Sequence, residues 1–560
     1  MKVQRIILAT IFAISAYLSL GQLGEPALWD DEAHVALYAR SFLQIGHWSA
    51  WDGRNLAGGD RNGAYLNNEL RHVMPQLDYV IAAGAFRVFG VSTWTARIAF
   101  ALAGMAALGA FYLWLKMEMP REFTLHSYAL ASLAFSVTWL LNIRTCRYYS
   151  LAALLLLAGL IAYKKFFQTK NWLCLGLLAL CAALLFYTSA LVCGAFLLAL
   201  AARHFIFYGR DCARREWLLL GGCGTLFLAL ILPYALTCVR AYTAAARAEQ
   251  AASGAHPEPW LASRFILLWW NVRELNTVNA LPWLIIAGLA AWYFFSAKED
   301  AQTQREKRAV AEWSCIAAVY VTGIALLSPQ PVQLTRIADV RYLSPALPLF
   351  AALCAVVFTA LHRRTTIHAG VSALVIFVMT NLGGVWPTDW NFRWLLPEFV
   401  NEINTPYPTS CSEAAKYLRQ HASKDDHVFA LPDFIQKPLV FYVGDHVRVC
   451  GLLDHRTHLP AAAVERCDPA LLIEDAYPEW IVSCGAQPNL GQIAGFFSRP
   501  HTPAGTDKTV TFQYQLAQLL PVYWDQTQRP ELPWHSFGPK QRFNPASEAV
   551  YIFKRRNTVP

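Results

Sequence analysis

The chain has 560 residues, of which 56% are hydrophobic and 15% are charged, and its mean hydropathy is +0.30. A soluble enzyme would carry about 25% charged residues, so the composition predicts a membrane protein whose spans take about 20 apolar residues each. The formal net charge of +9 does not indicate nucleic-acid binding, because the lysines and arginines lie mostly in loops between apolar segments, where they set orientation.

Eleven apolar segments are predicted to cross the membrane. Every loop on one side of them is basic, which places the N-terminus in the cytoplasm and, with an odd number of spans, the chain after Trp386 outside. The first segment lacks a convincing signal-peptide cleavage site and is interpreted as a retained anchor. The predicted spans are residues 6–23, 93–115, 124–142, 148–163, 171–187, 189–207, 217–237, 280–297, 311–328, 343–361 and 367–385.

These spans divide the chain into two parts. Residues 1–385 form a mainly α, polytopic membrane module, which includes a first outer loop over residues 24–92. Residues 386–560 form a C-terminal extracytoplasmic domain. The location expected for such a protein is the bacterial inner membrane, with the C-terminal domain in the periplasm.

The first outer loop opens with three consecutive acids, Asp30, Asp31 and Glu32, within the stretch LWDDEAHVALYAR. An apolar stripe follows them and predicts a helix. One interpretation is local, with an aspartate as the N-cap and Glu32 as an acid that suits the helix dipole. The other is chemical, because grouped carboxylates can hold a general base, bind a metal or orient a polar acceptor.

Two further segments of this loop stand out. Trp51–Asn68 is rich in Gly, Asn, Asp and Arg and is interpreted as a loop over a cleft. Met74–Gly90 has helical periodicity but is shorter than a span, which favours an amphipathic helix on the membrane surface.

Several arginines lie on the outer side, against the topological bias, among them Arg144, Arg147 and Arg341. A single arginine near a membrane surface commonly extends its head group to water. Several of them facing an acidic loop suggest a site for an anionic ligand such as a phosphate.

The tail after residue 386 is richer in charge and proline and predicts a small α/β domain. Ser412–His421 has the pattern of a short amphipathic helix. The predicted strands are His427–Pro432, Leu439–Val443, Trp480–Ser483 and Val550–Lys554.

Four cysteines fall in this tail: Cys411, Cys450, Cys467 and Cys484. Outside the cytoplasm they could form two disulfides, whose connectivity the sequence leaves open. No CxxC pair or His/Cys cluster has zinc-ligand spacing.

The sequence contains no internal repeat, no Walker loop, no GxGxxG entering a helix and no GxSxG elbow. If the chain is a transferase, its donor is therefore not expected to be a cytoplasmic nucleotide sugar bound by a Rossmann-type domain.

Three stretches together resemble the GT-C glycosyltransferases, in particular the protein O-mannosyltransferase-like group and the lipid A aminoarabinose transferases. The first is Asp31-Glu32 with the HVALYAR that follows. The second is Met74–Gly90 leading into WTARIAFALAGMAAL, which resembles a proline-containing juxtamembrane helix, an FG turn and a span. The third comprises the turn RTCRYY at Arg144 and the stretch RYLSPALP at Arg341. The resemblance covers about residues 1–385.

This resemblance implies a polyprenyl-phosphate-linked sugar donor and transfer on the outer face with inversion at the anomeric carbon. Asp31 would be the base or the carboxylate that orients the acceptor, and Glu32 would support it. The donor phosphate would be bound by cations and hydroxyl donors, and the candidates are Arg144, Arg147, Arg341, Tyr148, Tyr342 and His72.

The sequence departs from the pattern of these relatives in two places. Where they often place Lys or His beside the juxtamembrane proline, this chain has Val73-Met74-Pro75, so His72 or Arg71 is the candidate substitute. Some relatives also carry an acid after the arginine turn, whereas this chain has Tyr149 and Ser150. Asp30 and Asp339 are the candidates for that second acid.

Two other functions compete with a transferase. A transporter or flippase of lipid-linked or anionic solutes should show ionisable residues within broken spans and repeated halves, neither of which the sequence shows. A non-enzymatic envelope assembly protein could use the tail as a binding module. The sugar, the acceptor (lipid, glycan or protein) and any divalent metal are left open. The expected partners are the lipid donor, the acceptor and membrane lipids, with no nucleic acid.

Overall fold

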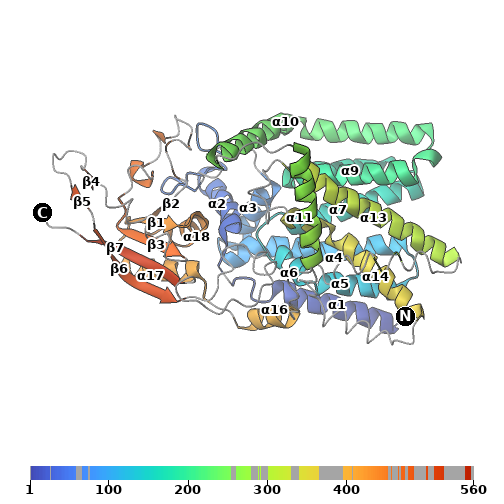
Figure 1. Cartoon of the computed structure of the whole chain (residues 1–560), viewed down its shortest axis with the longest axis horizontal. Coiled ribbons are helices and arrows are strands. Elements are labelled where there is room, and N and C mark those ends of the chain that lie inside the picture. Colours follow the sequence, from blue (N-terminus) through green and yellow to red (C-terminus); the bar gives the residue numbers. More distant parts are fainter. Residues whose placement is uncertain are drawn as a thin grey trace.

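A computed structural model shows long helices at one end of the molecule and a small sheet at the other, with the helices of the first outer loop between them (Figure 1). It describes residues 2–25, 27–57, 66–73, 76–253, 260–278, 288, 291, 301–328, 340–364, 395–405, 408–451, 454, 456, 459, 464–465, 468–472, 477–484, 500–501, 510–511, 513–521 and 549–556.

The helical body is formed by consecutive apolar helices joined by short turns. Hydroxyl side chains start several of them, since Ser92 accepts from the Thr95 amide (3.1 Å) at the start of α4 and Ser189 from the Val192 amide (3.4 Å) at the start of α9. The elements are α1 (Lys2–Leu20), α4 (Thr93–Glu118), α5 (Phe123–Ala134), α6 (Val137–Ile143), α7 (Tyr149–Thr169), α8 (Trp172–Thr188), α9 (Ala190–Phe207), η2 (Gly209–Asp211), α10 (Arg214–Ser253), α11 (Trp260–Val278), α13 (Ala301–Leu327), the 3₁₀ helix η3 (Val340–Ala346), α14 (Leu347–Arg364) and α16 (Leu395–Asn404).

Among the described residues, seven helical spans are long and apolar enough to cross a membrane, and α5 with α6, bent by 62°, makes an eighth. Helix α8 is apolar but has only 17 residues. Of the eleven predicted spans, 367–385 lies outside the described residues and 280–297 almost wholly so. The other nine coincide with these helices, and the chain is an integral membrane protein.

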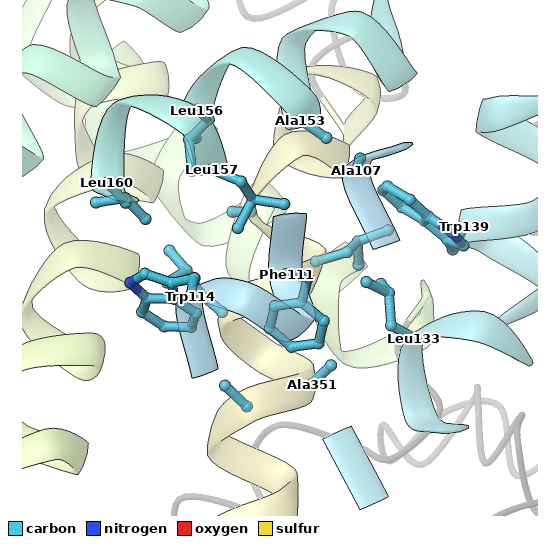
Figure 2. Close-up of a cluster of buried hydrophobic side chains, with 14 of the residues drawn as sticks. Ala107, Phe111, Trp114, Leu133, Trp139, Ala153, Leu156, Leu157, Leu160 and Ala351 are labelled. Atoms are coloured by element: carbon cyan, nitrogen blue, oxygen red, sulfur yellow. The ribbon is translucent and has the colours of Figure 1, made fainter. Parts of the chain in front are cut away.

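Small residues let large ones pack closely in the core of this body, which Figure 2 shows around Phe111 and Trp114 of α4. Lipid tails are as apolar as leucine, so helices in a membrane associate through close packing rather than through burial from water. Gly104 of α4 is the tightest example, because a Cβ atom there would lie 2.5 Å from Cβ of Ile143. A larger residue at position 104 would push α4 and α6 apart.

A buried group of charges joins four of these helices. Arg203 of α9 donates to Glu118 Oε1 of α4 (2.9 Å) and to Glu312 Oε2 of α13 (2.6 Å). Lys164 of α7 donates to Glu118 Oε2 (2.9 Å), and Arg308 donates to Glu312 Oε1 (3.1 Å). These five residues are called the Arg203 cluster below. It fixes the ends of α4, α7, α9 and α13 relative to one another.

The first outer loop contributes α2 (Asp30–Ile45) and α3 (Leu77–Phe89), which pack against each other. Stacked rings lie at their interface, with Tyr38 of α2 and Tyr79 of α3 5.1 Å apart and 7° from parallel. The prediction of a helix within Met74–Gly90 is thus correct from Leu77 onward. Part of the predicted loop over a cleft, residues 58–65, lies outside the described residues.

The tail contains the predicted α/β fold. Its five-stranded sheet has the order β2-β1-β3-β7-β6, in which β1 is parallel to β2 and β3, and β7 is antiparallel to β3 and β6. The elements are α17 (Ser410–His421), β1 (His427–Leu431), α18 (Asp433–Val443), β2 (Arg448–Gly451), η5 (Pro469–Leu471), β3 (Trp480–Cys484), β6 (Gln513–Pro521) and β7 (Ala549–Arg556), with a separate pair, β4 (Pro500–His501) and β5 (Val510–Thr511).

The strand predicted at Leu439–Val443 is wrong, because this segment is the second half of helix α18. Ile435, Leu439 and Val443 are fully buried and four residues apart, which is the spacing of one helix face. The apolar run taken alone is too short to distinguish a strand from a helix. Strands β2 and β6 were not predicted.

The predicted cysteine pairs of the tail remain predictions. Cys411, Cys450 and Cys484 are buried, and the Cys450 thiol donates to the Val428 carbonyl (3.6 Å). Cys467 lies outside the described residues.

The tail and the first outer loop form one packed unit. Arg40 of α2 donates to the carbonyls of Val440 (3.3 Å) and Phe441 (3.1 Å) near the end of α18. Asn55 of the loop donates to the Gly444 carbonyl (2.8 Å) and accepts from the Val449 amide (2.9 Å). One apolar core runs through α2, α3 and the tail. The tail is therefore positioned to contribute side chains to the surroundings of the three acids at the start of α2.

Candidate active site

The three acids of the outer loop occupy the first turn of α2, after the N-cap residue Trp29. Neither Asp30 nor Asp31 is the N-cap, so the local interpretation of an aspartate cap is wrong. Glu32 accepts from the Trp29 amide (3.4 Å), as an acid at this position often does. All three carboxylates are favoured by the positive end of the helix dipole.

Glu32 is fully buried, and two groups besides the Trp29 amide donate to it. Arg97 of α4 donates to both of its carboxylate oxygens, at 2.8 and 2.6 Å, and the Cys146 amide donates at 2.7 Å. Removing one partner of such a buried ion pair costs about 3–5 kcal/mol. Glu32 therefore joins α2 to α4 and to the turn before α7, and it holds the neighbouring acids in place.

Asp31 lies between two of the predicted phosphate ligands. Arg341 Nη1 of η3 donates to Asp31 Oδ2 at 2.5 Å, and Arg147 Nη2 lies 3.3 Å from the same oxygen. The Asp31 side chain keeps 24% of its surface exposed, whereas both arginines are nearly buried. The structure thus brings together three residues that are far apart in sequence.

Two predicted tyrosines complete this group. Tyr148 and Tyr342 stack with ring centroids 6.0 Å apart, and the guanidinium groups of Arg147 and Arg341 lie over their rings at 5.4 and 5.6 Å. Asp31, Arg147, Arg341, Tyr148 and Tyr342 are called the Asp31 cluster below.

Several buried donors of the Asp31 cluster have no hydrogen-bond partner: Arg147 Nε, Arg341 Nε and the Tyr148 hydroxyl. Buried polar groups are nearly always paired, and leaving one unpaired costs free energy. A cluster of unpaired cationic and hydroxyl donors is therefore a place where an anionic ligand would supply the missing acceptors.

Asp30 has a partner that the sequence did not reveal. Lys437 of α18, in the tail, donates to Asp30 Oδ1 at 3.0 Å, and only 7% of the lysine side chain is exposed. Nothing in the local sequence marks this lysine, because its role depends on the docking of the tail against α2.

The assignment of Arg144 as a phosphate ligand remains a prediction, and its described contacts lie elsewhere. Its guanidinium donates to the carbonyls of Leu18 (2.9 Å), Ser19 (3.2 Å) and Gly21 (2.7 Å). These groups lie at the end of α1, where helix carbonyls lack partners within the helix. The contacts described for Arg144 thus bind the end of α1.

The ring contacts described for His72 are with aromatic rings of α2 and α3. Its ring meets Tyr38 and Tyr79 edge to face, with centroids 5.2 and 5.5 Å apart. His34 of α2 shares this aromatic group, with its Nε2 3.0 Å from the Tyr79 hydroxyl. The assignment of His72 as a phosphate ligand remains a prediction, and His72 packs here among aromatic rings.

Asp78, in the first turn of α3, was not predicted as a site residue. It is fully buried, its Oδ1 accepts from the Tyr79 amide (3.1 Å), and its Oδ2 has no partner. Burial raises the pKa of this carboxyl to about 6, with Arg147 acting in the opposite direction and the charge of Asp31 adding to the rise. Asp78 thus lies within electrostatic range of both residues. Asp339, a predicted second acid, lies outside the described residues.

No group of three His, Cys, Asp or Glu side chains in the described part of the chain is arranged to hold a metal ion. The chemistry of the Asp31 cluster, two guanidiniums and two phenols around one carboxylate, is that of an anion site.

No protein-family model matches the sequence, and no curated protein matches it. The fold does match solved structures. One is ArnT from Cupriavidus metallidurans bound to undecaprenyl phosphate, with 14% identity over 90% of this chain and 96% of that one and a TM-score of 0.50.

Two others are the arabinofuranosyltransferase AftD from Mycobacteria (14% identity, 98% of this chain and 40% of that one, TM-score 0.47) and the archaeal oligosaccharyltransferase AglB from Archaeoglobus fulgidus (11% identity, 90% and 74%, TM-score 0.44). ArnT has the GT-C fold, and the match to ArnT spans nearly the whole of both chains. The fold of this chain is therefore the GT-C fold that the sequence resemblance predicted.

Proposed function

We propose that the chain is an inverting glycosyltransferase, which moves a sugar from a polyprenyl-phosphate donor to a hydroxyl-bearing acceptor at the outer face of the membrane. The observation that carries this proposal is the position of Asp31 between Arg147 and Arg341. Such a reaction needs cations for the leaving phosphate and a carboxylate for the acceptor hydroxyl. The Asp31 cluster holds both kinds of group at one point.

The cationic side of the cluster would bind the donor phosphate. Arg147 Nε, Arg341 Nε and the Tyr148 hydroxyl are buried donors without partners, so phosphate oxygens would satisfy groups that are now unpaired. Charge builds up on the phosphate as the anomeric bond breaks, and preorganised cations stabilise that charge. The related ArnT structure was solved with undecaprenyl phosphate, which supports a lipid phosphate as the ligand.

The carboxylate would serve the acceptor. Asp31 Oδ2 is held by both guanidiniums in this structure, so the donor phosphate would compete for the same cations and free this oxygen. Asp31 then takes the proton of the acceptor hydroxyl while the hydroxyl oxygen attacks the anomeric carbon. The electron pair of the broken anomeric bond stays on the lipid phosphate. Attack opposite to the leaving group inverts the anomeric centre.

Two neighbouring contacts would keep Asp31 in place. Glu32, bound to Arg97, fixes the first turn of α2 to the helical body. Lys437, bound to Asp30, fixes the same turn to the tail. In this proposal Glu32 is a positioning residue, and Asp30 is a link to the tail rather than a second acid. In this proposal the helical body spans the bacterial inner membrane, and the tail lies in the periplasm.

The test is transfer of labelled sugar from a polyprenyl-phosphate donor by purified Asp31→Asn protein. Asparagine keeps the shape of the side chain but cannot accept a proton, and general-base contributions are about 10²–10⁴-fold in rate. We expect normal membrane insertion and a rate lower by about that factor. Asp30→Asn is the matched control and should lose much less. Near-wild-type transfer by Asp31→Asn would contradict the assignment.

A further inference from the structure

Asp78 is a buried carboxylate that the mechanism above does not use. An acid in the first turn of a helix is ordinarily explained by the helix dipole and by its bond to a nearby amide. That explanation accounts for the hydrogen bond that Asp78 Oδ1 accepts from the Tyr79 amide. It accounts neither for the complete burial of the side chain nor for an Oδ2 atom without a partner.

Arg147, within electrostatic range of Asp78, also carries an unpaired buried atom. Its Nε is a buried donor without a partner, and its charge is the strongest attraction acting on Asp78. Arg147 is also the more distant of the two cations on Asp31, at 3.3 Å against 2.5 Å for Arg341. Arg147 is therefore the cation that can leave Asp31 at the smaller cost.

We propose that Asp78 is a positioning residue, which in its ionised form draws Arg147 away from Asp31 and so makes Asp31 Oδ2 available to the acceptor. This inference rests on the proposed function. Asp78 itself is fully buried and touches no substrate, whereas Asp31 is partly exposed. The proton of the acceptor goes to Asp31, and Asp78 decides how tightly Arg147 competes for that carboxylate.

Ionisation of Asp78 is the controlling event, and its raised pKa places that event near neutral pH. Below about pH 6 Asp78 is protonated, Arg147 stays on Asp31, and transfer slows. The donor is a phosphodiester and does not titrate in this range. The elements around α3 carry other titratable and charged groups, among them Asp31, Glu32, His34, Tyr38 and Arg40 of α2, Arg97 of α4, Cys146 and Arg147 of the turn before α7, Tyr187 of α8 and His72 of the preceding loop.

The experiment is the pH dependence of transfer by wild type and Asp78→Asn. We expect the wild-type rate to fall with pH around pH 6 and to level off about tenfold lower, because protonated Asp78 is uncharged like the asparagine of the variant. Asp78→Asn should be about tenfold slower at pH 8 and should lack this acid limb. Asp31 and the histidines remain in the variant, so an acid limb near pH 6 that survives there belongs to one of them and overturns the proposal. Glu413→Gln, at the first-turn acid of α17, is the control and should match wild type.

Binding of undecaprenyl phosphate supplies a second measurement, which does not require turnover. Removing the charge of Asp78 removes one of the two carboxylates that compete with the phosphate for Arg147, so Asp78→Asn should bind several-fold more tightly than wild type at pH 8 and equally at pH 5. Slower transfer with tighter binding is the expected pair of results. Weaker binding together with slower transfer would mean a purely structural role. If wild type binds but transfers no sugar from any lipid-phosphate donor, the proposed function fails, and the binding difference alone decides the role of Asp78.

Discussion

The two ends of helix α4 carry two buried groups of charge that look alike in sequence but differ in completeness. Glu118, at one end, belongs to the Arg203 cluster, and Arg97, near the other end, lies beside the Asp31 cluster. Arg97 and Glu118 are 21 positions apart, which corresponds to about 30 Å of helix. Both groups use arginines and carboxylates from several helices.

In the Arg203 cluster each carboxylate oxygen is matched by the protein itself. Glu118 is bound by Arg203 and Lys164, and Glu312 by Arg203, Arg308 and the Tyr208 hydroxyl. Arg203 Nη1 has no partner. The carboxylates of this cluster need no ligand, and its contacts join helices.

In the Asp31 cluster two guanidiniums crowd one carboxylate oxygen while other buried donors stay unpaired. Unpaired buried groups lower stability, so their retention is a mark of function rather than of packing. Among the residues that the structure describes, the Asp31 cluster has three unpaired buried donors and the Arg203 cluster has one. The comparison teaches that the number of unpaired buried donors, and not the presence of buried charge, separates a ligand site from a structural tie.

The largest effect that would test this contrast is on stability. Arg203→Met should lower the free energy of unfolding by about 3–5 kcal/mol, because Glu118 and Glu312 would lose their shared partner in a buried setting. Thermal unfolding in detergent measures the loss. Transfer activity per folded molecule should stay near that of wild type. A stable Arg203→Met protein with low specific activity would show that this cluster also acts in the reaction.

The corresponding substitution in the Asp31 cluster is Arg341→Ala, whose main effect should be on activity rather than on stability. Removing one preorganised donor to a developing negative charge typically costs about 10²–10³-fold in rate. Arg341→Lys should recover only part of it, since lysine keeps the charge but not the planar fork. Transfer rates and thermal unfolding should be measured on the same preparations. If Arg341→Ala lost stability in proportion to its loss of activity, the role of Arg341 would be structural.

How far the sequence predicted this molecule depends on the range of the interaction. Spans were found because twenty apolar residues are a local property, and nine predicted spans coincide with helices. Asp31, Arg147 and Arg341 were found together through resemblance. Lys437 was missed because its contact with Asp30 joins residues 407 positions apart.

Two further residues show a different physical limit of sequence reasoning. Asp78 has the sequence context of an ordinary first-turn acid, and only its burial distinguishes it. Arg144 was grouped with Arg147 because the two are three residues apart. The turn between α6 and α7 separates them, and it directs Arg144 to the end of α1 and Arg147 to Asp31.

The smallest effect is expected for Arg144→Ala, and it sharpens the boundary of the site. This arginine binds carbonyls at the end of α1, partly in contact with solvent, so its loss should cost about 1 kcal/mol of stability, as for other helix caps and single hydrogen bonds. Transfer should change less than about threefold, because the described contacts of Arg144 do not include the Asp31 cluster. The same transfer assay used for Arg341→Ala measures it. A loss as large as that of Arg341→Ala would place Arg144 among the donor ligands and extend the site to the end of α1.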